Sequence, residues 1–294
     1  MKSKLSSRSL ARTGLKILPL ILFLSACSSS ITASFQKEDI PQAVKDICKK
    51  EYKLDISTKL VGSTLWVYMP LENIISKPPK PEKYIERFLL EDKNSFFEEK
   101  ILKVNYLIKP TQEKEKQQEM ALDKSVNEKI FDVLQVIRRV VFSIDNSKKG
   151  NLLFFCIVTA DIKNAFEIKQ TFYFPDLKKL SYGIVSQTEY QHRIVQDTAV
   201  SPMIIGDKEG GHLIYRDITL EEFIAGQIQG RIKLKFGKPE VEKNANIDEE
   251  ILKIVASTLN IYQYKDFTFV EVTNLVNNSK AVLSRAAILA HSKE

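Results

Sequence analysis

The chain has 294 residues and a net charge of +7, and 44% of its residues are hydrophobic. Five of its 44 lysines and arginines fall within the first 16 residues, where there is no acidic residue, so the remainder holds 39 basic against 37 acidic residues. A body so close to neutral lacks the excess of basic residues that proteins use to bind nucleic acid, and we expect no nucleic-acid partner.

The amino terminus has the layout of a secretory signal. The basic segment is followed by an apolar run from Ile17 to Leu24 and then by the small residues Ser25 and Ala26. The run is far shorter than the roughly 20 residues that cross a bilayer as a helix. We therefore expect residues 1–26 to be a cleaved signal peptide.

The stretch "LSAC" at residues 24–27 resembles the lipobox of bacterial lipoproteins, and the resemblance covers residues 1–27 only. In that family the cysteine thiol receives a diacylglyceryl group, the signal is removed just before it, and the new amino group is acylated. The resemblance implies that Cys27 is lipidated and that residues 27–37 form a flexible tether to a membrane of the bacterial cell envelope. Ser28 favours, by the sorting rule of that family, the periplasmic face of the outer membrane. A cleaved signal with an incidental cysteine is the competing interpretation.

Beyond the tether, helical and strand patterns follow one another. Apolar spacing and capping residues predict helices that open at Asp39, at the capping box Ser125–Glu128, at the capping box Thr219–Glu222 and at Asn246. Short turns between β-rich runs predict hairpins around residues 62–63, 163–165 and 277–279.

Two segments between the predicted elements contain few apolar residues. The segments "SKPPKPEK" and "KPTQEKEKQQEM" predict a charged, Pro-rich, flexible insertion at residues 76–128, with a short helix and a strand ending near Lys109 between them.

Farther on, a helix over residues 175–190 precedes two strands joined by the loop "GDKEGG" at 206–211, which we expect to be a solvated turn.

The order of these elements predicts an α+β protein with antiparallel sheets and helices packed on one face of each. A helix followed by a hairpin recurs, so the fold is expected to be built from repeated αββ units. We expect two regions, residues 38–200, which contain the insertion, and residues 201–294, although a single domain fits the same pattern.

Few residues suggest chemistry. Cys156 lies in the apolar run "LLFFCIV" and is expected to be a small core residue, with a disulfide to Cys48 as the alternative that export would permit. His192 and His212 could face each other on paired strands, and we interpret them as a surface pair and not as metal ligands. Trp66 is expected to pack in the core or at an edge. The sequence predicts no catalytic residue, metal site or cofactor.

These observations favour a membrane-anchored envelope lipoprotein, not an enzyme, that binds or scaffolds another envelope protein. A carrier for a small molecule or lipid, with a pocket between two lobes, is the alternative. An enzyme whose site is assembled from distant residues around His192 or His212 is the third interpretation.

Overall fold

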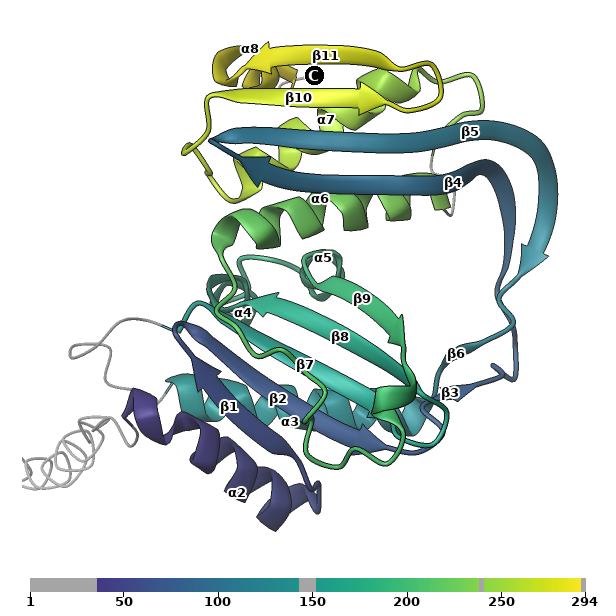
Figure 1. Cartoon of the computed structure of the whole chain (residues 1–294). Helices are drawn as coiled ribbons and strands as arrows, with labels where there is room; N and C mark the ends of the chain where they lie inside the picture. Colours follow the sequence, from purple (N-terminus) through teal and green to yellow (C-terminus); the bar gives the residue numbers. More distant parts are fainter. Residues whose placement is uncertain (1–35, 143–151, 238–240, 292–294) are drawn as a thin grey trace, which may run out of the picture.

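The computed structural model describes residues 36–142, 152–237 and 241–291. Cys27, the signal peptide and nearly all of the predicted tether lie outside these residues. The described chain contains helices and two main sheets arranged as two lobes (Figure 1), so the predicted α+β class is confirmed.

The first lobe is built on a five-stranded sheet with the strand order β1-β2-β7-β8-β9. All neighbouring strands are antiparallel except β2 and β7, which run parallel. The strands are β1 (Ser57–Val61), β2 (Thr64–Leu71), β7 (Phe154–Asp161), β8 (Phe166–Tyr173) and β9 (Val195–Val200). The hairpins predicted around residues 62–63 and 163–165 are confirmed as β1–β2 and β7–β8.

Alternate residues of the interior strand β2 enter two different cores, because successive side chains of a strand point to opposite faces. Leu65 and Val67 pack under α2 (Ile40–Tyr52) and α3 (Lys124–Phe142), whereas Trp66 and Tyr68 pack on the other face of the sheet. In the part of the chain that the structure describes, α2 and α3 contribute no residue to the cluster on that second face. It is covered by the segment that leads into α6 (Leu220–Gly237) and by the start of α6 itself.

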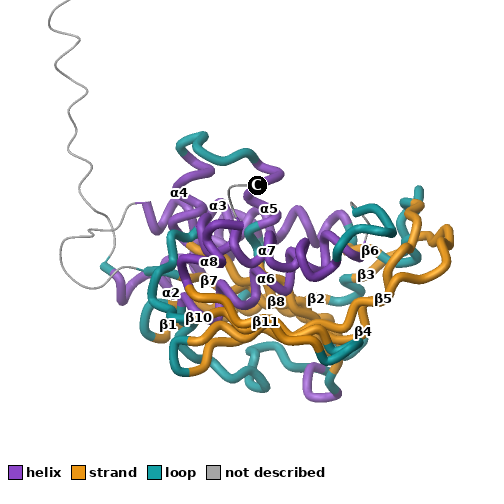
Figure 2. Tube along the Cα trace, turned by 90° about the horizontal axis from the view of Figure 1, so that it is seen from above, coloured by secondary structure: helices purple, strands orange, loops and turns teal. Residues whose placement is uncertain are grey.

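The second lobe is built on a four-stranded sheet with the order β11-β10-β5-β4. Its strands are β4 (Lys83–Glu98), β5 (Ile101–Gln117), β10 (Phe269–Asn274) and β11 (Ser279–Ser284). The helices α6, α7 (Ile247–Ile261) and α8 (Arg285–Ala290) contribute to its core, and seen from above the helices lie on one side of the strands (Figure 2). The hairpin predicted at residues 277–279 is confirmed as β10–β11.

The insertion predicted to be flexible is instead the longest hairpin of the molecule. Residues 76–128 contain β4 and β5, which pair antiparallel along their length, and the short pair β3 (Ile75–Ser76) with β6 (Ala121–Leu122) closes the base of this hairpin. The short helix predicted before Lys109 is therefore wrong. The boundary predicted at residue 200 also fails to separate the two sheets, because the second sheet takes two strands from before it and two from after it.

The half of the β4–β5 hairpin nearest its turn is held by burial. Leu102, Val104, Tyr106 and Ile108 alternate along β5 and are all at most 2% exposed. They face α6 and α7, so this half of the hairpin supplies one layer of the second core.

The other half, residues 83–91 and 109–117, forms an arm. It bends at two irregularities in the β4–β5 register and curves toward the first lobe (Figure 1). Four ion pairs join its strands: Lys83–Glu115 at 2.8 Å, Glu86–Lys116 at 2.5 Å, Arg87–Glu113 at 3.1 Å and Glu91–Lys109 at 3.1 Å. Opposite charges on facing strands are favourable and like charges are not, so this complementary pattern selects the observed pairing.

Most of the predicted helix starts agree with the structure. The helices predicted to open at Asp39, Thr219 and Asn246 are confirmed as α2, α6 and α7. The cap of α3 differs, because Asp123 and not Ser125 accepts the first backbone bond, from the Ser125 N–H at 2.9 Å. A helix–strand–strand order occurs at α2-β1-β2, α3-β7-β8 and α7-β10-β11, but this order alone does not confirm repeated units.

The helix predicted over residues 175–190 is two short helices, α4 (Phe174–Ser181) and α5 (Gln187–His192). The hairpin predicted after it is wrong: β9 pairs with β8, and residues 212–218 run over the first sheet without forming a strand. Within the described residues, no helix is both long enough and apolar enough to cross a bilayer.

Candidate functional site

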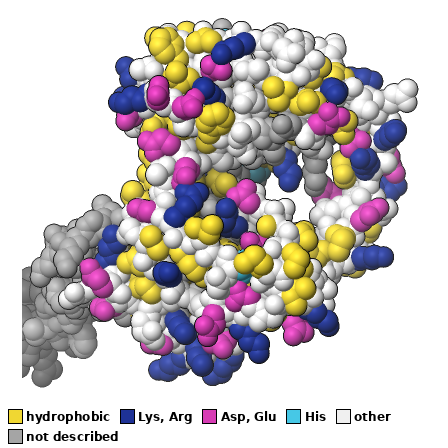
Figure 3. All heavy atoms as spheres, viewed as in Figure 1, with side chains coloured by type: hydrophobic (Ala, Val, Ile, Leu, Met, Phe, Trp, Pro, Cys, Tyr) yellow, Lys and Arg dark blue, Asp and Glu magenta, His cyan; other side chains and the backbone are white. Residues whose placement is uncertain are grey.

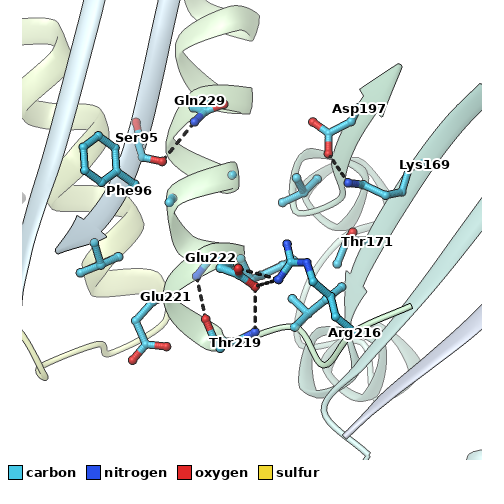
Figure 4. A pocket seen from close by; sticks show the side chains of 16 residues that line it. Ser95, Phe96, Lys169, Thr171, Asp197, Arg216, Thr219, Glu221, Glu222 and Gln229 are labelled. Carbon is cyan, nitrogen blue, oxygen red and sulfur yellow. Dashed lines mark hydrogen bonds and ion pairs between the residues drawn. The ribbon is translucent and has the colours of Figure 1, made fainter. Parts of the chain in front are cut away.

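A cleft of about 550 Å³ lies where the two lobes meet. The surface is hollowed between the lobes (Figure 3), and Figure 4 shows the cleft from close by. Its walls come from β4, from β8 and β9, from the segment 216–219 and from the first turns of α6. Because these segments are far apart in the sequence, only the folded chain assembles the cleft.

The segment 216–219 is fixed to the first sheet. Trp66 donates its indole N–H to the Arg216 carbonyl oxygen at 2.8 Å, and the Ile218 N–H donates to Thr64 Oγ1 at 2.9 Å. Asp217 Oδ1 accepts the Thr64 hydroxyl at 2.8 Å. Trp66 therefore packs in a core as predicted, and it also positions one wall of the cleft.

The β1–β2 turn fits closely against this segment. Asp217 Oδ1 accepts the Ser63 N–H at 2.9 Å and the Ser63 hydroxyl at 3.0 Å. Burial alone would raise the pKa of Asp217, but these bonds and that from Thr64 lower it below its ordinary value. Gly62 has φ +59°, and a Cβ there would lie 2.1 Å from Asp217 Oδ2. The glycine is thus required both by the turn and by the close approach of Asp217.

The predicted capping box at the start of α6 is confirmed. The Glu222 N–H donates to Thr219 Oγ1 and the Thr219 N–H donates to Glu222 Oε2, both at 3.2 Å. The Glu222 carboxylate also accepts Arg216 Nη1 at 2.6 and 2.5 Å, as Figure 4 shows. Glu222 therefore caps the helix and holds the guanidinium at the mouth of the cleft.

The facing walls carry a second ion pair and a tight contact. Lys169 Nζ on β8 lies 3.1 Å from Asp197 Oδ2 on β9. Where α6 crosses β9, a Cβ on Gly226 would lie 2.7 Å from Val195 Cγ1, so only glycine allows this approach. On β4, the Ser95 carbonyl oxygen accepts Gln229 Nε2 at 3.2 Å, which joins the second sheet to α6.

Charge in the cleft is nearly balanced. Each of the two cations, Lys169 and Arg216, has a carboxylate partner, and Glu221 accepts the Tyr264 hydroxyl at 2.8 Å. Phe97 and Phe223 add apolar surface between these groups. The lining offers polar and apolar contacts together but includes neither a histidine nor a cysteine.

A buried ionic cluster fixes α5 between the lobes. Arg193, which follows α5, lies 2.8 Å from Asp176 Oδ1 on α4 and 2.8 Å from Glu189 Oε1 on α5. Arg231 on α6 reaches the same Glu189 oxygen at 3.5 Å. The Asp176 side chain is only 1% exposed. Because α6 belongs to the second core, the cluster links the lobes on either side of the cleft.

His212 forms a separate site on the first lobe. Its Nδ1 lies 2.5 Å from Asp207 Oδ2 and its Nε2 lies 2.8 Å from Glu167 Oε2, and its side chain is 8% exposed. Burial alone would lower the pKa of His212, but the two carboxylates raise it above its ordinary value. The expectation of a surface pair with His192 is wrong, since His192 is exposed on α5. With both nitrogens occupied, the imidazole has none left to act as a general base.

The loop "GDKEGG" is likewise not a simple solvated turn. Asp207 Oδ1 accepts the N–H groups of Glu209 at 3.0 Å and Gly210 at 2.8 Å, and Tyr68 donates its hydroxyl to the Asp207 carbonyl oxygen at 2.7 Å. An aspartate five residues before a histidine in a Gly-rich loop is a local signal for such a contact. Nothing local pointed to Glu167.

The two described cysteines are free and buried. Cys48 lies on α2, in the core between the helices and the first sheet. Cys156 lies in the core on the other face of that sheet, so the alternative of a Cys48–Cys156 disulfide is wrong. Burial raises the pKa of both thiols to about 12, which suits core residues and not nucleophiles. Among the described residues, no cluster of histidine, cysteine and acidic side chains is arranged to hold a metal ion.

Comparison of the chain with protein families, with curated proteins and with solved structures finds no match.

Proposed function

We propose that this protein is a bacterial envelope lipoprotein, anchored through Cys27 at the periplasmic face of the outer membrane, that binds a segment of another envelope protein in the cleft between its lobes. The observation that carries the proposal is the lining of that cleft. It combines paired charges at the mouth with apolar side chains, as protein-binding surfaces do.

The lining also favours a polypeptide over a lipid. A carrier buries its ligand in a largely apolar pocket. Here Lys169, Asp197, Arg216 and Glu222 stand at the cleft, and a lipid chain entering it would strip water from both ion pairs without replacing their partners. A polypeptide segment brings its own polar groups to these side chains.

The cleft is also pre-formed. Hydrogen bonds hold the segment 216–219, and the Arg231–Glu189 contact joins α6 to the ionic cluster of the first lobe, so a partner would not have to order these walls. Pre-organised walls reduce the entropic cost of binding.

The anchor is tested by replacing Cys27 with alanine in the full chain and fractionating the cells. We expect the wild-type protein in the membrane fraction and the variant outside it. A variant that stays with the membrane to the same extent as wild type would contradict lipidation at Cys27.

The cleft is tested by placing a photo-crosslinking amino acid at Asp197 in the full chain expressed in its host. The control position is Glu128, at the exposed start of α3. We expect a defined protein adduct from position 197 and none from position 128. Arg216→Glu, which sets like charges against each other at the cleft mouth, should abolish the adduct, whereas Arg138→Glu on the exposed face of α3 should not. Equal adducts from both positions, or an adduct indifferent to Arg216→Glu, would refute binding in the cleft.

A further inference from the structure

Residues 206–214 cross the face of the first sheet, where an imidazole supplies an ionic contact beside the backbone and Tyr68 hydrogen bonds. His212 joins Asp207 of its own segment to Glu167 on β8, at 2.5 and 2.8 Å. The three side chains are between 8 and 15% exposed. This bridge is the ionic contact that connects the segment to a strand of the sheet.

The bridge requires a doubly protonated ring. Ionised carboxylates only accept hydrogen bonds, so each of the two imidazole nitrogens must carry a proton to donate to its partner. A neutral imidazole can donate to one carboxylate only, and its bare nitrogen would then face the other. Loss of one proton therefore turns an attractive contact between buried groups into a repulsive one.

The surroundings hold little to replace that proton. Around the ring stand Asp207 on the segment, Glu167 on β8 and Tyr68 on β2, whose ring lies 5.8 Å from the imidazole. In the part of the chain that the structure describes, neither carboxylate forms an ion pair with a lysine or arginine. The nearby charged groups are engaged or exposed: Lys169 with Asp197, Lys59 over the ring of Tyr215, and Lys208 and Glu209 at the surface of the segment.

Hydrogen bonds that do not involve His212 hold both ends of the segment. At one end the Gly206 N–H donates to the Ile162 carbonyl oxygen at 2.8 Å, and at the other the Ile218 N–H is bonded to Thr64. Between them Gly210 has φ +77°, and its carbonyl oxygen accepts the Tyr215 hydroxyl at 2.9 Å, so both bonding partners belong to residues 206–218. The ends can stay in place while the middle moves.

A buried surface lies beneath the segment. Tyr68 on β2 is 1% exposed, and its hydroxyl donates to the Asp207 carbonyl oxygen. Val158 on β7 is fully buried in the same core. Lifting the segment would expose this face of the sheet.

We propose that residues 206–214 form a pH-sensitive flap, closed over the first sheet while His212 is doubly protonated and released when it loses a proton. Release therefore occurs as the pH rises. The two carboxylates raise the pKa of His212, which moves the change upward from the ordinary value of about 6.5. The flap is independent of the cleft, because the segment 216–219 keeps its own bonds to Thr64 and Trp66.

The test is hydrogen exchange of the full chain between about pH 5.5 and about pH 9, expressed as protection factors that remove the intrinsic pH effect. The reporters are the amides of Glu209, Gly210 and His212, which are bonded to Asp207 in the closed segment. We expect their protection to fall by about tenfold or more as the ring titrates. The ring titration is followed in the same samples by NMR of the imidazole nitrogens.

Three variants sharpen the test. Glu167→Gln keeps the shape but removes one charge, and should move both the ring titration and the loss of protection to lower pH. Glu209→Gln removes an exposed charge of the same segment and should move neither. His212→Gln should abolish the pH dependence. Protection that stays constant in the wild type, or equal shifts from Glu167→Gln and Glu209→Gln, would overturn the proposal.

Discussion

The arm and the flap can be compared directly, because the sequence predicts the arm to be part of a flexible insertion and residues 206–211 of the flap to be a solvated turn, whereas charged contacts order both. In the arm, the side chains of the ion pairs are more exposed, from 19% for Glu86 to 65% for Lys83 and Glu115. In the flap, one imidazole between two carboxylates is nearly buried. The two regions differ in how far water reaches the charges. Each solvent-exposed ion pair contributes little to the free energy of unfolding, whereas a buried charge that loses its partner destabilises the fold strongly.

The largest expected effect is that of His212→Ala. The substitution leaves Asp207 and Glu167 facing each other, both at most 15% exposed, without the cation between them. We expect the free energy of unfolding to fall by about 3 kcal/mol, as for other broken buried pairs. Urea denaturation near pH 6 measures it, with His192→Ala on exposed α5 as the control. A loss equal to that of the control would show that the buried and exposed charges do not differ.

Glycine in the flap gives the next effect. Gly210 has φ +77°, and a Cβ there would lie 2.4 Å from the Tyr215 hydroxyl, whereas a Cβ on Gly211 meets nothing within 4 Å. Gly210→Ala should therefore destabilise by about 2 kcal/mol, and Gly211→Ala far less. Thermal unfolding of the two variants provides a matched pair. Similar losses in both would mean that the flap tolerates displacement.

A pH-dependent stability should accompany the flap but not the arm. Because the folded-state pKa of His212 is raised, its contribution is fully present below the unfolded value of about 6.5 and is lost as the pH rises through the folded value. Urea denaturation over this range should show the decline in wild type. His212→Gln should remove that part of the decline; an unchanged profile in the variant would contradict the assignment.

The smallest effect is expected from single charges of the arm. Glu115→Gln should leave the unfolding midpoint almost unchanged, because it removes one of four pairs and both side chains of that pair are 65% exposed. Added salt should lower the exchange protection of the arm amides more than that of the buried half around Val104, since exposed pairs are screened. Equal salt sensitivity in both halves would show that burial, and not charge pairing, holds the arm.

Much of the fold was predictable because its signals are local. The capping residues at Thr219 and Asn246 and the hairpin at Gly62 involve groups only a few residues apart, and they identify α6, α7 and the β1–β2 pair. Within the β4–β5 hairpin, the mirrored charges that now form pairs were visible in the sequence. The sequence nevertheless predicts a flexible insertion, because the segment "KPTQEKEKQQEM" holds few apolar residues.

The sites were harder to predict from the sequence. Asp207 and His212 are close in sequence, but Glu167 lies 45 residues from His212. The cleft draws on β4, β8, β9 and α6, and their meeting depends on a second sheet made from two separated parts of the chain.

By itself, the sequence determined where α2, α6, α7 and three hairpins begin, the α+β class, and the expectation of a lipid at Cys27, because each depends on neighbouring residues. Only the tertiary structure decided that the 76–128 region is a hairpin of the second sheet, that Cys48 and Cys156 lie on opposite faces of the first sheet, and that His212 sits between two carboxylates. The physical reason is that strand pairing and buried charge contacts join groups far apart along the chain. The free energy of these contacts depends on the identity of the distant partner and on the degree of burial, and a local sequence pattern indicates neither.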